Sequence, residues 1–119
     1  MITSYRDLDA WQLGMSFVES VYRLTSQFPR EEQFGLTAQL RRAAIGIPSH
    51  VAEGHQHGTR SYRHFVVMAL GSRAECETRL ELARRLAMAP EDQIVAAIEV
   101  AGRLGRVLHG LARSLPRDR

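Results

Sequence analysis

Residues 39–54 read QLRRAAIGIPSHVAEG, and the spacing of the apolar residues in and just before this stretch decides the fold class. Apolar positions recur every three or four residues, which predicts an amphipathic α-helix: Leu36, Leu40, Ala43 or Ala44, Ile47 and Val51. Gly54 is expected to cap this helix in a left-handed conformation. Pro48 removes one backbone hydrogen bond, so we expect a kink near Ala44 to Pro48 within a single helix.

Three further segments show the same helical spacing, and the predicted helices span about 7–28, 34–54, 59–88 and 90–115. The first carries two apolar stripes, which is more than one bundle core needs: Leu8, Trp11, Met15, Val18 and Tyr22, and Leu13, Phe17, Val21, Leu24 and Phe28. Thr59 is a suitable N-cap for the third, and Pro90 a favoured first residue of the fourth. Small residues at Ala69, Gly71 and Ser72 predict close approach of a neighbouring helix.

The length of 119 residues fits one domain covering 1–119. No segment alternates like a strand, so the sequence predicts an all-α, antiparallel up-down-up-down four-helix bundle. An apolar fraction of 45% is typical of a globular chain and not of a disordered one. Cys76 is the only cysteine, which excludes a disulfide framework, and neither a signal-peptide core nor a membrane span is seen, so we expect a cytoplasmic protein.

The charge is polarised along the predicted bundle. All 16 basic residues are arginines, against 13 acidic residues, and the net charge is +3. An antiparallel order brings residues 1–13, 48–68 and 105–119 to one end of the rod. Seven arginines, four acidic residues and all five histidines fall in these segments, so the whole net charge lies at that end.

An arginine stripe is predicted on the fourth helix. Arg103, Arg106, Arg113 and Arg117 fall within an arc of about 80°, opposite the leucine face, given 100° per residue. With Arg60 and Arg63 they are the predicted nucleic-acid-binding residues, because arginine tracks phosphates. The alternative is a solvated helix face, helped by a pair between Glu99 and Arg103.

Other chemistry has weak support in the sequence. His50, Glu53, His55, His57 and His64 could offer metal ligands, but they lack the fixed spacing of a known metal motif. The segment 54–59 is no phosphate-binding P-loop, because it is short and lacks lysine. Cys76 lies on an apolar helix face and is interpreted as a core residue. We therefore expect neither an enzyme nor a cofactor nor a bound metal.

The chain resembles the bacterial four-helix-bundle family named after proteins encoded in intervening sequences of 23S ribosomal RNA genes. The run 39–54 followed by ALGSRAE at 69–75 is the most specific part. The matching residues, spread over roughly 5–90, are Asp7-Leu8, Trp11-Gln12, Tyr22, Phe28-Pro29, Glu32, Phe34–Thr37, Gln39–Ala44, Ile47–Ser49, Ala52–Gly54, Ala69, Gly71-Ser72 and Glu75. The sequence departs from the family at Gly46, His50 and His57.

The resemblance implies a homopentameric ring, and similar proteins include accessory proteins of diversity-generating retroelements, which associate with a reverse transcriptase and nucleic acid. Our leading hypothesis is therefore a non-enzymatic pentamer that binds RNA or DNA through its basic end by phosphate contacts. The alternative is a protein-interaction scaffold or accessory subunit, for example for a reverse transcriptase, without nucleic-acid binding of its own. A third hypothesis, a metal-dependent enzyme, requires the histidines to converge.

Overall fold

Four long helices make up nearly all of the protein in a computed structural model, which describes residues 3–117. They are α1 (Asp9–Thr25), α2 (Leu36–His57), α3 (Thr59–Arg85) and α4 (Glu91–Ser114), and short 3-10 helices at Tyr5–Asp7 and Arg30–Glu32 precede α1 and α2. The described part of the chain contains no strand, which confirms the prediction of an all-α fold.

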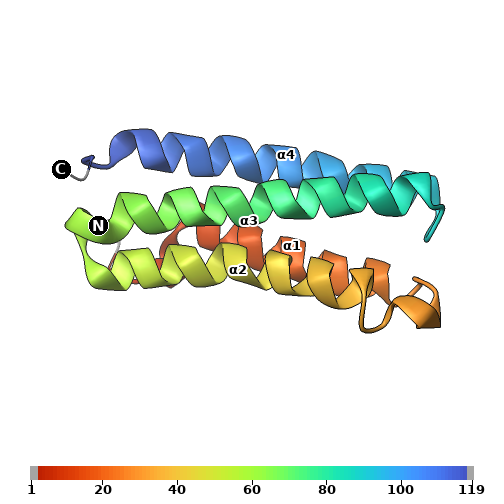
Figure 1. The fold of residues 1–119 in the computed structure, drawn as a ribbon. Coiled ribbons are helices and arrows are strands. Elements are labelled where there is room, and N and C mark those ends of the chain that lie inside the picture. The colour runs from red at the N-terminus through yellow and green to blue at the C-terminus, as the bar shows by residue number, and fades with distance from the viewer. Residues whose placement is uncertain (1–2, 118–119) are drawn as a thin grey trace.

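The helices pack side by side into a rod of 43 × 24 × 23 Å (Figure 1). Helix α1 contacts α2 and α4, and α3 contacts the same two helices from the opposite corner. The start of α1, the α2–α3 junction and the end of α4 lie at one end of the rod, while the α1–α2 and α3–α4 connections lie at the other (Figure 1). We call the first of these the junction end. The described parts of the three segments that hold the net charge therefore lie together there.

All four helices contribute to one apolar core. Its largest fully buried side chains include Phe17, Leu40, Ile47, Leu80, Ile94, Leu104 and Leu108. One of the two predicted stripes enters this core through Phe17, Val21 and Leu24, while the other is buried only at Leu8, with Trp11 and Val18 partly buried against the core. On the other stripe Met15 is 39% exposed and Tyr22 is 41% exposed, so α1 keeps apolar surface that this chain does not cover.

The glycine that ends α2 is not the predicted one. Helix α2 continues through Gly54 to His57, and the chain turns at Gly58, which has φ of 90°. Gly54 is buried against α3, where a Cβ would stand 2.8 Å from the Phe65 Cβ atom and 3.0 Å from the Tyr62 ring. The expected cap at Gly54 was therefore wrong, because that glycine serves close helix packing and not a turn.

Two predicted helix starts also differ from the structure. Thr59 is the first residue of α3, and the residue in the N-cap position is Gly58. Pro90 occupies the N-cap position of α4, one residue before the predicted place, and its carbonyl accepts from the amide N–H groups of Gln93 and Ile94. Differences of one residue are usual at helix ends.

The prediction of a close helix approach at the small residues of α3 is confirmed for Ser72 but not for Gly71, and Ala69 is fully buried. Ser72 of α3 faces Gly46 of α2, where an added Cβ would lie 2.9 Å from the Ser72 hydroxyl oxygen. Gly71 is exposed and has nothing within 4 Å of its Cβ position, so the expectation for it was wrong. Helix α2 continues through Pro48 without a break. Gly14 of α1 lies against this proline, because a Cβ on Gly14 would be 3.4 Å from the Pro48 ring.

Candidate nucleic-acid interface

The six predicted arginines lie on α3 and on or just beyond α4. Arg60 and Arg63 belong to the first two turns of α3, while Arg103 lies near the middle of α4. Arg106 and Arg113 follow on α4, and Arg117 lies beyond its last residue, Ser114. All are exposed except Arg63, which is half-buried. The leucines opposite the stripe, Leu104 and Leu108, are fully buried, so the stripe faces solvent as predicted.

The register between α3 and α4 decides which of these arginines share a level along the rod. The Arg73 guanidinium on α3 lies against Gly105 on α4, 2.8 Å from where a Cβ would stand. Ten residues correspond to about 15 Å of helix. Moving that far toward the junction end reaches Arg63 on α3 and the neighbourhood of Arg113 on α4 (Figure 1). The structure thus groups Arg60, Arg63 and Arg113 at this end and leaves Arg103 nearer the middle.

Ion pairs engage three arginines of α3. Over N···O distances of 3.1 to 3.8 Å, Arg73 pairs with Glu77, Arg79 with Glu75, and Arg84 with Glu81 and Glu91. Some arginines away from the junction end have no ion pair in the described residues: Arg23, Arg30, Arg42 and Arg85. Within residues 3–117 none of the six predicted arginines forms an ion pair, and the expected pair between Glu99 and Arg103 is not formed. Their guanidinium groups keep their donors available for an anion.

One arginine from each of the two resembling runs, Arg41 and Arg73, has a structural role. Arg41 donates from Nε to the Thr25 hydroxyl over 2.8 Å and lies 4.4 Å from the centre of the Tyr22 ring, which ties α2 to the end of α1. Arg73 donates to Glu77 and lies across α4 at Gly105. Arg41 and Arg73 thus hold helices together, and both lie away from the junction end.

A set of aromatic side chains at the α2–α3 junction was not found from the sequence. The His57 ring stacks on Phe65 at 5.2 Å between ring centres with 16° between the planes, and His64 meets Phe65 edge-on at 5.6 Å. His55 packs edge-on against Tyr62 at 5.8 Å, and burial raises the pKa of the Tyr62 hydroxyl. The sequence offered one signal for this set: His55 and His57 precede Gly58 at alternate positions, and the aromatic residues Tyr62 and Phe65 follow it.

The histidines do not assemble a metal site. His50 Nδ1 lies 3.3 Å from Glu53 Oε1, but no group of three or more histidine, cysteine, aspartate or glutamate side chains in the described residues is placed to hold a metal ion. His55, His57 and His64 instead contact aromatic rings of α3. Cys76 is fully buried, and burial raises the pKa of its thiol to about 12, which confirms the interpretation as a core residue.

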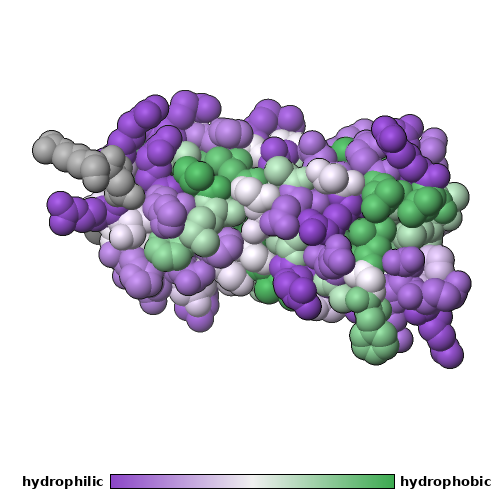
Figure 2. Space-filling model, in the orientation of Figure 1, coloured by the Kyte–Doolittle hydropathy of each residue, from purple (hydrophilic) through white to green (hydrophobic). Residues whose placement is uncertain are grey.

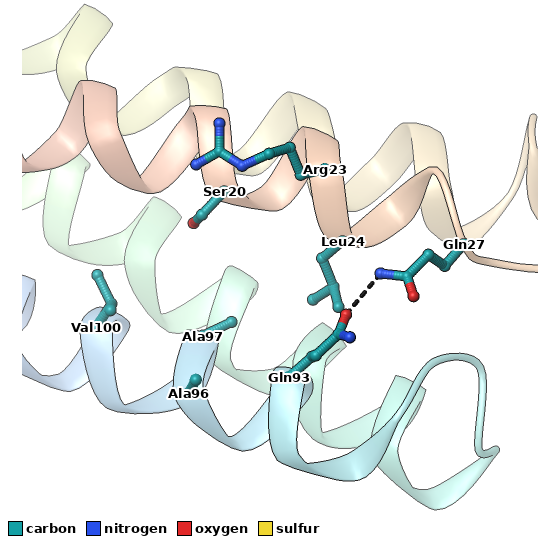
Figure 3. A pocket seen from close by; sticks show the side chains of 8 residues that line it. All are labelled: Ser20, Arg23, Leu24, Gln27, Gln93, Ala96, Ala97 and Val100. Atoms are coloured by element: carbon teal, nitrogen blue, oxygen red, sulfur yellow. Dashed lines mark hydrogen bonds between the residues drawn. The ribbon is translucent and has the colours of Figure 1, made fainter.

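Two grooves border α1. A groove of about 280 Å³ lies between α1 and α4 (Figure 3), where Gln27 donates to the Gln93 side-chain oxygen over 2.6 Å. Its walls are mostly small or apolar: Ser20, Arg23, Leu24, Gln27, Gln93, Ala96, Ala97 and Val100. Between α1 and α2, Ile45 borders two adjoining hollows, one beside Trp11 and Met15 and one beside Phe34. Figure 2 shows apolar groups in separate patches among hydrophilic side chains.

Fold and surface together define an all-α four-helix bundle with unpaired arginines at one end. The family described as 23S rRNA-intervening sequence protein matches residues 6–110, and the chain belongs to this family. A comparison with curated proteins finds no match. A crystal structure from Bacteroides thetaiotaomicron, described as a protein with unknown function from the S23 ribosomal protein family, is similar with a TM-score of 0.77. It is 17% identical over 87% of this chain and 98% of that chain, a likeness in fold. None of the helices in residues 3–117 is long and apolar enough to cross a membrane.

Proposed function

We propose that this protein is a non-enzymatic, cytoplasmic homopentamer of antiparallel up-down-up-down bundles that binds RNA or DNA through the junction end, mainly by phosphate contacts. One observation carries the nucleic-acid part: Arg60, Arg63 and Arg113 lie together at the junction end, and these three, like Arg103, Arg106 and Arg117, have no ion-pair partner within the described residues. Unpaired, exposed guanidinium groups are the form in which arginine binds phosphate oxygens.

Assembly would strengthen this attraction. Five copies of a chain with a net charge of +3 carry +15, which raises the local concentration of a polyanion and its association rate. Helix α1 supports assembly, because Met15, Tyr22 and the neighbouring Ile45 of α2 leave apolar surface that a second copy would cover. Phe34, 90% exposed, extends the same surface. A head-to-tail interface between two different patches closes into a ring when its rotation permits.

Two matched triple variants test the nucleic-acid proposal. Exchanging Arg106, Arg113 and Arg117 for glutamine removes three unpaired charges without touching the leucine face, so the helical circular dichroism should be unchanged. Affinity for RNA or DNA should fall, and the salt dependence should weaken by about 0.7 to 0.9 log units per log unit of salt for each phosphate that the variant no longer binds.

The control exchanges Arg79, Arg84 and Arg85 for glutamine, which removes the same charge at the opposite end and should weaken binding much less. Absence of binding by the wild-type protein to single-stranded RNA, duplex DNA and structured RNA at low salt would contradict the proposal. So would an equal loss of affinity in the two triple variants.

A second candidate function is a protein-interaction scaffold or an accessory subunit, for example of a reverse transcriptase. The apolar surface around Ile45 and the groove between α1 and α4 favour it, since both are lined mainly by apolar or small side chains. Under this alternative the purified protein captures a protein partner but binds no nucleic acid at low salt. The same titration therefore discriminates between the two functions.

A further inference from the structure

The α2–α3 junction presents aromatic rings on the outside of the bundle. His57, the last residue of α2, and His64, in the second turn of α3, are both exposed, and each contacts the ring of Phe65. We call these three residues the junction aromatic set. The His57 and Phe65 rings are nearly parallel, so the exposed imidazole offers a flat face backed by a second ring.

Local sequence explains why these rings meet. Gly58 alone separates the two helices, so the last turn of α2 lies directly beside the first turns of α3. Gly54 has no side chain, and this lets the Phe65 Cβ atom approach to 2.8 Å from the position a Cβ would take on Gly54. Phe65 is thereby anchored on α2 while part of it stays accessible, and the two histidines border it.

Charges next to the set suit a phosphate backbone. Arg60 is exposed one helical turn before His64, and Arg63 directly precedes it. Neither arginine has an ion-pair partner in residues 3–117. Glu53 is the acidic residue one turn before His57 on α2, and its carboxylate is engaged with His50 at 3.3 Å. Flat rings alternating with free guanidinium groups are the arrangement that single-strand binding proteins use.

We infer that the junction aromatic set stacks unpaired bases, so that the preferred ligand of the junction end is a single-stranded segment of nucleic acid. This inference rests on the proposed function and deepens it. In a duplex the faces of the bases are already covered by their neighbours, and the grooves present base edges only. An unpaired base has a free face for His57, while Arg60 and Arg63 bind the adjoining phosphates. Because every base has such a face, preference for sequence is weak.

The test compares a single strand with a duplex of the same sequence at one salt concentration and pH 8, where imidazoles in general are neutral and contribute no charge. The single strand carries 2-aminopurine, whose fluorescence falls when it stacks, and it is made once as DNA and once as RNA. The wild-type protein should bind at least one of these strands more tightly than the duplex and quench its fluorescence.

Single imidazole deletions then locate the effect. His57→Ala should weaken binding of the single strand about 5- to 150-fold, the range expected for loss of one base stack, and leave duplex binding unchanged. His109→Ala is the matched control, since His109 is exposed on α4 toward the same end but lies outside the aromatic set. Phe65→Leu keeps an apolar contact with Gly54 and removes the ring, so it should reduce the quenching.

The outcomes separate this inference from the proposed function. Absence of binding to any probe overturns both. Equal affinity for single strand and duplex overturns the stacking inference alone, as does an equal loss on both ligands in His57→Ala, no loss at all in that variant, or a bound strand without quenching.

Discussion

Gly54 of α2 lies directly against Phe65 of α3, with only 2.8 Å between the Phe65 Cβ atom and the place where a Cβ on Gly54 would stand. The backbone carbonyl of Tyr62 is 3.1 Å from the same point. A backbone atom cannot move aside as a flexible side chain can. The close approach therefore sets how near α2 and α3 lie at the junction end, and through Phe65 it positions the junction aromatic set.

Alanine at two helical glycines should have opposite effects. Gly54→Ala should lower the free energy of unfolding by about 1 to 3 kcal/mol, the usual cost of overpacking. Gly71→Ala should raise it by about 1 kcal/mol, because Gly71 has open space around its Cβ position and alanine favours helix. Urea unfolding followed by circular dichroism measures both values. A stabilised Gly54→Ala variant would show that the helices can separate at no cost.

Substitution of Gly58 should be costly for a different reason. Its φ of 90° and ψ of 180° lie in a region that is essentially reserved for glycine, although nothing crowds its Cβ position. Gly58→Ala and Gly58→Asn should each lower the free energy of unfolding by about 1 to 3 kcal/mol. Asparagine tolerates ordinary left-handed turns, so a near-neutral Gly58→Asn variant in thermal unfolding would mean that the junction adopts such a turn instead.

The apolar surface of α1 and α2 should control oligomeric state. Ile45 is 42% exposed and borders both hollows between these helices, so Ile45→Glu should place a charge in the subunit interface and reduce the assembled mass. Light scattering after size exclusion should give about five times 13.4 kDa for the wild-type protein.

The matched control for assembly is Leu82→Glu on α3. Leu82 is also about half exposed, at 46%, but it lines neither of those hollows, so its substitution should leave the mass unchanged. A wild-type mass of 13.4 kDa at micromolar concentration would contradict the pentamer.

Burial of Cys76 should make stability fall at high pH. Because the thiol pKa is raised from 9.0 to about 12 in the folded protein, the unfolded chain loses this proton first as pH rises. The contribution of the protonated Cys76 thiol to the free energy of unfolding is fully present below pH 9.0 and declines between pH 9.0 and about 12. Its slope is about 1.4 kcal/mol per pH unit at most.

Comparison with Cys76→Ala isolates the contribution of this thiol from that of all other titratable groups. The difference in unfolding free energy between wild type and variant, measured by urea titration at several pH values, should narrow as pH rises. A difference that stays constant with pH would contradict the raised pKa of the Cys76 thiol.

The sequence by itself determined that the chain is helical, where the helices lie to within a few residues, and that charge gathers at one end. These properties follow from apolar residues recurring every three or four positions and from the order of the chain, so they need no knowledge of contacts. The buried role of Cys76 and the outward direction of the α4 arginine stripe followed in the same way.

Only the tertiary structure decided which apolar stripe of α1 is covered, which glycine packs and which turns, and which arginines remain unpaired. Each depends on what a neighbouring helix places opposite the residue. Gly54 and Gly58 are chemically identical, yet one meets Phe65 and the other meets nothing within 4 Å. The periodicity of the sequence fixes the helix face on which a side chain lies. The residue that it meets on the facing helix is distant in sequence, so helix packing alone determines that partner.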